Sequence, residues 1–336
     1  LFLFFVKTSV YAHEAYVLTR DEFQEGLKIN STNPLAPLID PAHWQIFLAI
    51  SVFVGLTYGF SILWSTTSIS QKIDKQIRKL AVFGPLTIRI VISIVFFASA
   101  MTNSIFGPEL SLNLIPHGEI IRIMLFILSA MIITGFLVEI AALISFGIFT
   151  YMFFNTGTYM VTYANFLGEI VVLFLFGSRF LSADKLLFGQ KLWIKGIEKF
   201  KDLEIPIVRM LYGLALMYTA YSIKFQHQAL PIEVYNQYHL KEFFKESAEF
   251  IAAGAGLAEF MIGMFIFFGF VMRLTIIIAL IFITLSLLYF GEIVWPHLML
   301  YGISISLIIN SADKFTIDRY LIPFVGRSLK KINKSI

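Results

Sequence analysis

Long uncharged apolar runs, separated by short polar segments, make up most of this chain. Each run approaches the roughly 20 residues that a helix needs to cross the hydrocarbon core of a bilayer. Because backbone polar groups in lipid must be paired within the chain, such runs predict helices. Nine runs follow one another, at 44–64, 86–106, 120–136, 140–154, 164–180, 207–225, 248–270, 274–290 and 296–310. We therefore predict an all-α, polytopic integral membrane protein with about nine transmembrane helices.

The composition strengthens this prediction. Of 336 residues, 58% are hydrophobic and 14% charged, and 36 are phenylalanine. A folded surface in water needs more polar cover than this, so a water-soluble globule is excluded and the lipid bilayer is the main partner. The absence of cysteine excludes disulfides and thiolate-bound metals.

The positions of lysine and arginine predict the orientation. The segments at 65–84, 182–206 and after Asn310 carry fifteen of them, whereas the segments assigned to the other side carry four. Cytoplasmic segments are enriched in these residues, so we expect the cytoplasmic (inner) membrane, with the N-terminus outside and the C-terminus inside. Residues 1–12 resemble the end of a signal peptide, cleaved after Ala12 to leave His13 first. A short interfacial helix is the alternative.

Two parts of the chain share features in the same order. The tetrapeptide at 182–185 recurs at 311–314, Gly135-Phe136 matches Gly269-Phe270, and Arg89 matches Arg209. These matches predict two tandem, parallel four-helix repeats. The expected domains are a signal remnant 1–12, an extracytoplasmic segment 13–43, a lone helix 44–64, a cytoplasmic loop 65–85, repeat one 86–189, a linker 190–206, repeat two 207–322 and a basic tail 323–336.

The second repeat resembles the DoxX family. The resemblance lies in Arg209, a small-residue span with Glu259, Gly269-Phe270-x-x-Arg273, Pro296-His297, and the exit motif of Asp313, Lys314, Phe315 and Asp318. The first repeat keeps Arg89 and Asp184-Lys185 but has Leu125 and Glu139 at the expected Glu and Arg positions. The resemblance implies a membrane subunit that supports redox chemistry, with a quinone site and redox partner proteins.

Glu259 is the leading candidate for a catalytic residue, because ionisable residues at membrane depth are costly and often functional. Ala252, Ala255, Gly256 and Gly263 share its helical face, which directs Glu259 into the bundle. Two interpretations stay open: a packing residue, or a proton relay and quinone ligand. Lys224 either extends to the headgroups or reaches Glu259.

Other charged candidates lie nearer the membrane surfaces. For Glu169, a structural pair with Arg122 is favoured over catalysis. Arg89 and Arg209 are expected to anchor at the interface or to bind an anionic group of a cofactor or lipid.

All six histidines fall on the predicted outer side. His13, His117, His227 and His239 could form a copper site that includes the amine of His13, although polar outer segments alone could also account for them. His297 is the one histidine that enters a span, and it joins Glu259 and Glu169 as a catalytic candidate.

Three functional classes remain: a DoxX-like redox subunit, a small-solute transporter or channel, and a membrane scaffold. Phosphate-binding and nucleophile motifs are absent, and the basic loops are explained by topology, so nucleic acid is not expected as a partner.

Overall fold

The computed structural model describes residues 17–177, 181–188, 197–311 and 313–335. The predicted signal remnant and His13 lie outside these residues. The regular secondary structure of the described chain is helical except for a short antiparallel hairpin of β2 (Ser104–Ile105) and β3 (Gly107–Ser111). The all-helical prediction is confirmed in this form.

A helix covers most of each apolar run. These helices are α4 (Trp44–Ser65), α6 (Gly84–Thr102), α7 (Gly118–Thr134), α8 (Val138–Thr156), α9 (Ala164–Phe176), α11 (Glu204–Thr219), α13 (Ala248–Phe268), α14 (Met272–Phe290) and α15 (Val294–Ile309). By length and composition, five helices of the described chain could cross a membrane: Trp44–Ser65, Ser68–Thr102, Val138–Phe176, Ala248–Phe268 and Met272–Phe290. The protein is therefore a membrane protein by its apolar helices.

Shorter elements connect the long helices or lie at the ends of the bundle. Towards one end are α2 (Arg20–Gly26), α3 (Ala36–Ile39), η3 (Leu112–Leu114), η4 (Gly157–Tyr163), α12 (Ala229–Gln237) and η7 (Leu240–Glu242). Towards the other are α5 (Ser68–Ile77), η2 (Arg78–Phe83), α10 (Ala183–Phe188), η5 (Ile197–Leu203) and α16 (Asp318–Ser335). The predicted basic tail is thus mostly helix, and the last three residues of the predicted linker (190–206) belong to α11.

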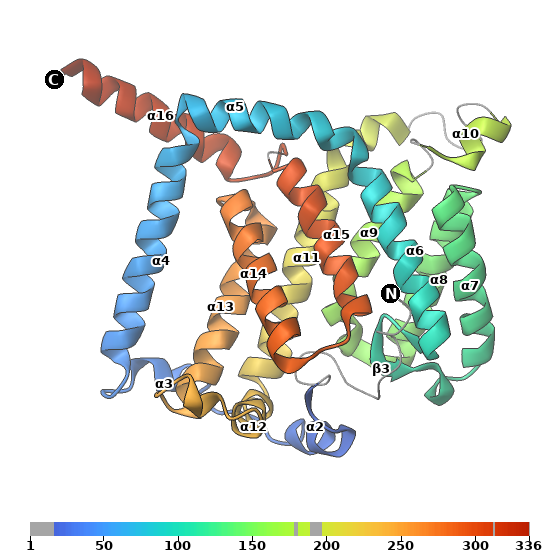
Figure 1. Cartoon of the computed structure of the whole chain (residues 1–336), viewed down its shortest axis with the longest axis horizontal. Coiled ribbons are helices and arrows are strands. Elements are labelled where there is room, and N and C mark those ends of the chain that lie inside the picture. Colours follow the sequence, from blue (N-terminus) through green and yellow to red (C-terminus); the bar gives the residue numbers. More distant parts are fainter. Residues whose placement is uncertain (1–16, 178–180, 189–196, 312, 336) are drawn as a thin grey trace.

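The long helices form one bundle with α4 standing at its edge (Figure 1). Helix α11 packs against both α13 and α9, and α6 packs against both α7 and α15. Small residues allow the closest approach: a Cβ atom on Gly213 of α11 would lie 2.5 Å from the carbonyl oxygen of Gly263 on α13. Close packing at glycine is typical of helices that associate in membranes.

Most side chains of α4 face outward. Only 6% of its apolar window is buried. Its exposed side chains include Phe53, Leu56 and Phe60. A helix so apolar on all sides is stable when lipid surrounds it. Helix α4 therefore marks the lipid-facing edge of the described bundle.

Candidate functional site

Lys224 and Glu259 form an ion pair inside the bundle. The distance from Lys224 Nζ to Glu259 Oε2 is 2.7 Å, and the side chains are 7% and 3% exposed. Glu259 lies near the middle of α13, and Lys224 lies on η6 (Ala220–Phe225), which continues α11. Of the two sequence interpretations of Lys224, the structure shows the contact with Glu259.

The chain around Lys224 is shaped to admit this contact. Segment η6 is a π-helix, in which the Gln226 N–H donates to the carbonyl oxygen of Tyr221 at 2.9 Å. Gly256, one turn before Glu259, would bring a Cβ atom within 2.9 Å of Lys224 Cβ. The small-residue face predicted for α13 thus lets η6 approach. Single π turns within helices occur frequently at functional sites.

The second carboxylate oxygen of Glu259 has no hydrogen-bond donor among the described residues. This atom, Oε1, is buried. Tyr212 of α11 is fully buried in electrostatic contact with Glu259, and its hydroxyl lies 3.4 Å from Ser304 Oγ. A buried acceptor with spare lone pairs beside an ammonium group can accept a proton or a donor group of a ligand.

A second buried pair joins His297 to Glu292. His297 Nε2 lies 2.9 Å from Glu292 Oε2, and the side chains are 3% and 0% exposed. His297 Nδ1 lies 2.9 Å from the carbonyl oxygen of Ile293, and Ser286 donates to Glu292 Oε1 at 2.6 Å. Both ring nitrogens of His297 therefore face oxygen atoms of the protein.

Sequence reasoning missed Glu292, which lies in the connection between α14 and α15. Its position five residues before His297, next to the Pro296-His297 motif, was the available signal.

Glu169 does not form an ion pair with Arg122, the partner that the sequence suggested. It is 0% exposed in α9, and neither carboxylate oxygen accepts a hydrogen bond among the described residues. Arg122 instead lies 3.4 Å from Glu119 on α7, with its own side chain 41% exposed. The predicted Arg122–Glu169 pair is wrong: Arg122 is on an outer face of α7, whereas neighbouring Gly168 packs against Leu211 of α11.

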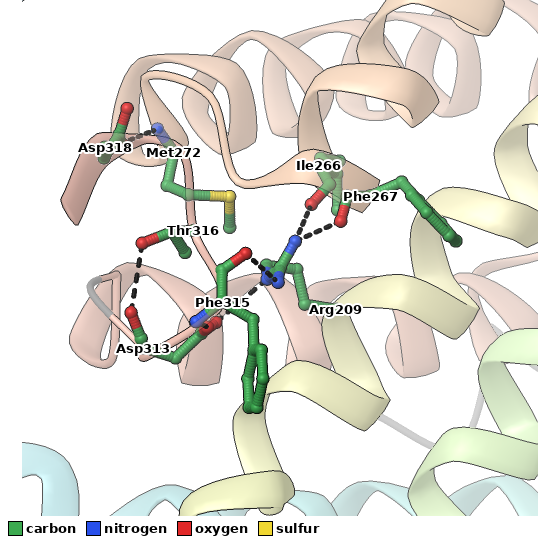
Figure 2. Close-up of polar contacts among 8 residues, drawn as sticks. All are labelled: Arg209, Ile266, Phe267, Met272, Asp313, Phe315, Thr316 and Asp318. Carbon is green, nitrogen blue, oxygen red and sulfur yellow. Dashed lines mark hydrogen bonds and ion pairs between the residues drawn. The ribbon is translucent and has the colours of Figure 1, made fainter. Parts of the chain in front are cut away.

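Arg209 is buried in protein rather than anchored at a lipid surface. It is 1% exposed. Its Nη1 donates to the carbonyl oxygens of Ile266 and Phe267, and its Nη2 donates to that of Phe315 at 3.3 Å (Figure 2). Its Nε donates to Asp313 Oδ2 at 2.9 Å. Arg209 therefore ties the end of α13 to the segment after α15, which satisfies carbonyl groups left open at the helix end.

Arg89 makes the corresponding contacts in the first half of the chain. It is 3% exposed. Its Nη1 donates to the carbonyl oxygen of Gly177 at 3.2 Å, and its Nη2 donates to that of Leu181 at 2.6 Å. Interfacial anchoring, one of the two interpretations of these arginines, is therefore wrong for both.

Each arginine lies beside a helical hairpin that an aspartate caps. Asp184 accepts from the Leu137 and Val138 N–H groups at 2.8 and 3.3 Å. In the second hairpin, Asp318 accepts from the Val271 and Met272 N–H groups at 2.7 and 2.9 Å. Carboxylates at helix N-termini satisfy open N–H groups and complement the helix dipole. We call each set of arginine, hairpin and aspartate a hairpin clamp.

The described histidines do not assemble a metal site. Among the residues that the structure describes, no group of three His, Cys, Asp or Glu side chains is placed to hold a metal ion. His117 and His239 are exposed at turns with positive φ, and His227 Nδ1 lies 3.2 Å from the carbonyl oxygen of Ile29. His43 lies 3.4 Å from Glu246 and stacks on Phe250.

Comparisons of the chain with protein-family models, curated proteins and solved structures found no match. The resemblance to the DoxX family consequently rests on the sequence motifs alone.

Proposed function

We propose that the chain spans the cytoplasmic membrane nine times, with the N-terminus outside, as a lone helix followed by two tandem four-helix modules. The hairpin clamps support the repeat, because Gly135 and Gly269 lie 134 residues apart, as do Asp184 and Asp318. With this spacing, Asp184 corresponds to Asp318, whereas the shared tetrapeptide would align Asp184 with Asp313. The tetrapeptide thus lies at different distances from the hairpin in the two proposed modules, whereas the capping aspartate keeps the same distance.

We further propose that the protein exchanges protons at the Lys224–Glu259 pair in support of redox chemistry at a quinone. The buried ion pair with an open carboxylate oxygen is the observation that carries the proton step. Intramembrane acids and bases paired in a bundle interior are typical of proton relays. The quinone-linked part rests on the resemblance to the DoxX family.

Transport of a small solute is the second candidate. The proposed modules are parallel and meet through α9 with α11 and α6 with α15. Transporters built from repeats often place an ion-coupled site near the bilayer midplane. The Lys224–Glu259 pair would then couple proton movement to solute movement.

The test uses the purified full-length protein in liposomes. With ferricyanide as the electron acceptor, we expect the wild type to oxidise a soluble ubiquinol analogue to the quinone, with release of two protons and reduction of two ferricyanide ions, and we expect loss of this turnover in Glu259→Gln and Lys224→Met. Glu249→Gln is the control, since Glu249 lies exposed at the start of the same helix. Quinol turnover that survives Glu259→Gln contradicts the proposal, and proton-dependent solute flux without quinol turnover favours the second candidate.

The topology is tested separately with reporter fusions. A fusion at His117 should report the outer side and one at Lys195 the cytoplasmic side. The reverse result contradicts the proposed orientation.

A further inference from the structure

Helix α16 lies across one end of the bundle, at the end of α4 (Figure 1). The two helices are in contact, and a Cβ atom on Gly326 of α16 would lie 3.8 Å from Thr66, the residue that follows α4. Helix α4 has 22 residues, which at 1.5 Å per residue gives a length of about 33 Å, close to the roughly 30 Å of a hydrocarbon core. Since lipid surrounds α4, its end marks the headgroup level, and α16 lies at that level.

The composition of α16 suits this position. Its exposed side chains include Tyr320 and Phe324, at 70% and 62%, together with Lys330 and Lys331. Large exposed aromatic groups beside basic ones are typical of helices that lie in the membrane interface. In water this combination would leave apolar surface uncovered.

The same helix lines an open cavity of about 580 Å³. Its lining residues are Ile317, Arg319, Tyr320, Leu321, Pro323, Phe324 and Arg327. Two arginines and no acid line this cavity. The neighbouring Asp318 does not neutralise them, because it is buried as the cap of α14. The cavity therefore presents positive charge next to aromatic surface.

The two guanidinium groups have hydrogen-bonding capacity to spare. Arg327 Nε donates to the carbonyl oxygen of Pro323 at 3.3 Å, which fixes the side chain along the helix. Within the described residues, no hydrogen bond or ion pair uses the two terminal nitrogens of Arg327 or any side-chain nitrogen of Arg319. Guanidinium groups bind phosphate oxygens through paired N–H donors.

Helix α5, which follows α4 directly, has similar features. Ile69, Ile73 and Leu80 are spaced along one side of α5 and η2 and are 57%, 46% and 49% exposed. Exposed basic residues accompany them: Lys72, Lys75, Arg78 and Lys79. A second amphipathic segment at the same end of α4 supports a membrane-surface position for this face.

We propose that α16 is an in-plane interfacial helix that binds anionic lipid, with Arg319 and Arg327 on the phosphate headgroup and Tyr320 and Phe324 in the headgroup–acyl boundary. This inference is independent of the proposed proton chemistry. The negative lipids of the cytoplasmic leaflet attract basic segments near the membrane, so the predicted orientation matches the ligand.

Lipid titration of the full-length protein, followed by native mass spectrometry, tests this proposal. Dioleoylphosphatidylglycerol should bind more tightly than dioleoylphosphatidylcholine. The attraction of two basic side chains to an anionic membrane surface corresponds to about a 30-fold change in affinity. We therefore expect R319Q/R327Q to weaken phosphatidylglycerol binding by about that factor and to leave phosphatidylcholine binding unchanged.

K241Q/K245Q is the matched control, because it removes the same charge from exposed positions at the opposite end of the bundle. Retained phosphatidylglycerol preference in R319Q/R327Q overturns the proposal. Displacement of the lipid by equimolar inorganic phosphate also overturns it, since the ligand would then be a soluble anion.

A single variant with an optical readout tests the position of the helix. In nanodiscs, F324W should add tryptophan fluorescence to that of the wild type. Lipids brominated near the headgroup should quench this added fluorescence. Added fluorescence that these lipids leave unquenched would place Phe324 outside the bilayer and contradict the in-plane position.

Discussion

Removal of either charge of the Lys224–Glu259 pair should destabilise the protein more than removal of both. At the 2.7 Å between Nζ and Oε2, Coulomb's law with an effective dielectric constant of about 20 gives an attraction of about 6 kcal/mol. The desolvation of two buried charges offsets part of this attraction, but one charge left alone keeps its desolvation cost. Breaking such a pair typically costs ~3–5 kcal/mol.

We therefore expect Lys224→Met to lower the free energy of unfolding by ~3–5 kcal/mol. Glu259→Gln should cost about 3 kcal/mol, at the low end, because its amide oxygen still accepts from Lys224. The amide of Glu259→Gln keeps the volume of the side chain, so this cost comes mainly from the buried charge left on Lys224. The double variant K224M/E259M keeps the side-chain volume and removes both charges. Its free energy of unfolding should therefore lie within about 1 kcal/mol of that of the wild type.

Unfolding of the purified protein by sodium dodecyl sulfate in mixed micelles measures these values, with tryptophan fluorescence as the signal. Asp202→Asn is the control, because the Lys314–Asp202 pair is 56% exposed on each side and should contribute less than ~1 kcal/mol. For the double-mutant cycle, the single changes are Lys224→Met and Glu259→Met, and they should be coupled by about 3 kcal/mol or more. If they add within ~0.5 kcal/mol in the double variant, the two charges act independently and the reasoning is refuted.

Three further predictions concern the hairpins. Burial raises the pKa of Glu109 to about 7. The contribution of Glu109 to stability is therefore complete below the pKa near 4.5 of an unfolded glutamate and is lost as the pH rises through about 7. The unfolding temperature of the wild type, but not of Glu109→Gln, should fall over that pH range. Gly269→Ala should cost ~1–3 kcal/mol in the same unfolding assay, because Gly269 has φ +69° and its Cβ would lie 2.5 Å from Thr316 Cγ2; Gly147→Ala, with open space around it, is the control and should be neutral or stabilising. Asp318→Ala removes the cap of α14 and should cost ~1–2 kcal/mol; an unchanged midpoint would contradict the role of the clamp.

The apolar pattern was enough to predict where the long helices lie, because lipid forces each uncharged run to pair its backbone within itself. The pattern also placed Glu259 on a small-residue face, and the structure puts Lys224 beside that face. Hydropathy carries no information about local helix geometry, so it could not predict the π turn of η6 that positions Lys224.

Side-chain partners across helices were harder to predict than the helices. Arg122 and Glu169 lie at similar predicted depths, yet depth alone does not fix the face of a helix on which a side chain lies. Arg122 consequently pairs with Glu119 within its own helix. The sequence did not indicate Glu292, because a carboxylate in a connection between helices is normally exposed. Here the contacts with His297 and Ser286 offset the cost of burying the carboxylate.

The proposed repeat explains why the ion pair is confined to the second half of the chain. The distance along the chain between the two capped hairpins relates Glu259 to Leu125. The distance between Arg89 and Arg209 relates Lys224 to Ser104. Both Leu125 and Ser104 are buried and neutral. A charged lysine or glutamate alone at one of these positions would be a buried charge without a partner. It would lower the free energy of unfolding by roughly 3–5 kcal/mol. The two charges can thus be present together or absent together, and the first proposed module has neither at these positions. We therefore infer that the clamps, which both proposed modules contain, serve the fold, and that the proposed chemistry lies where these modules differ.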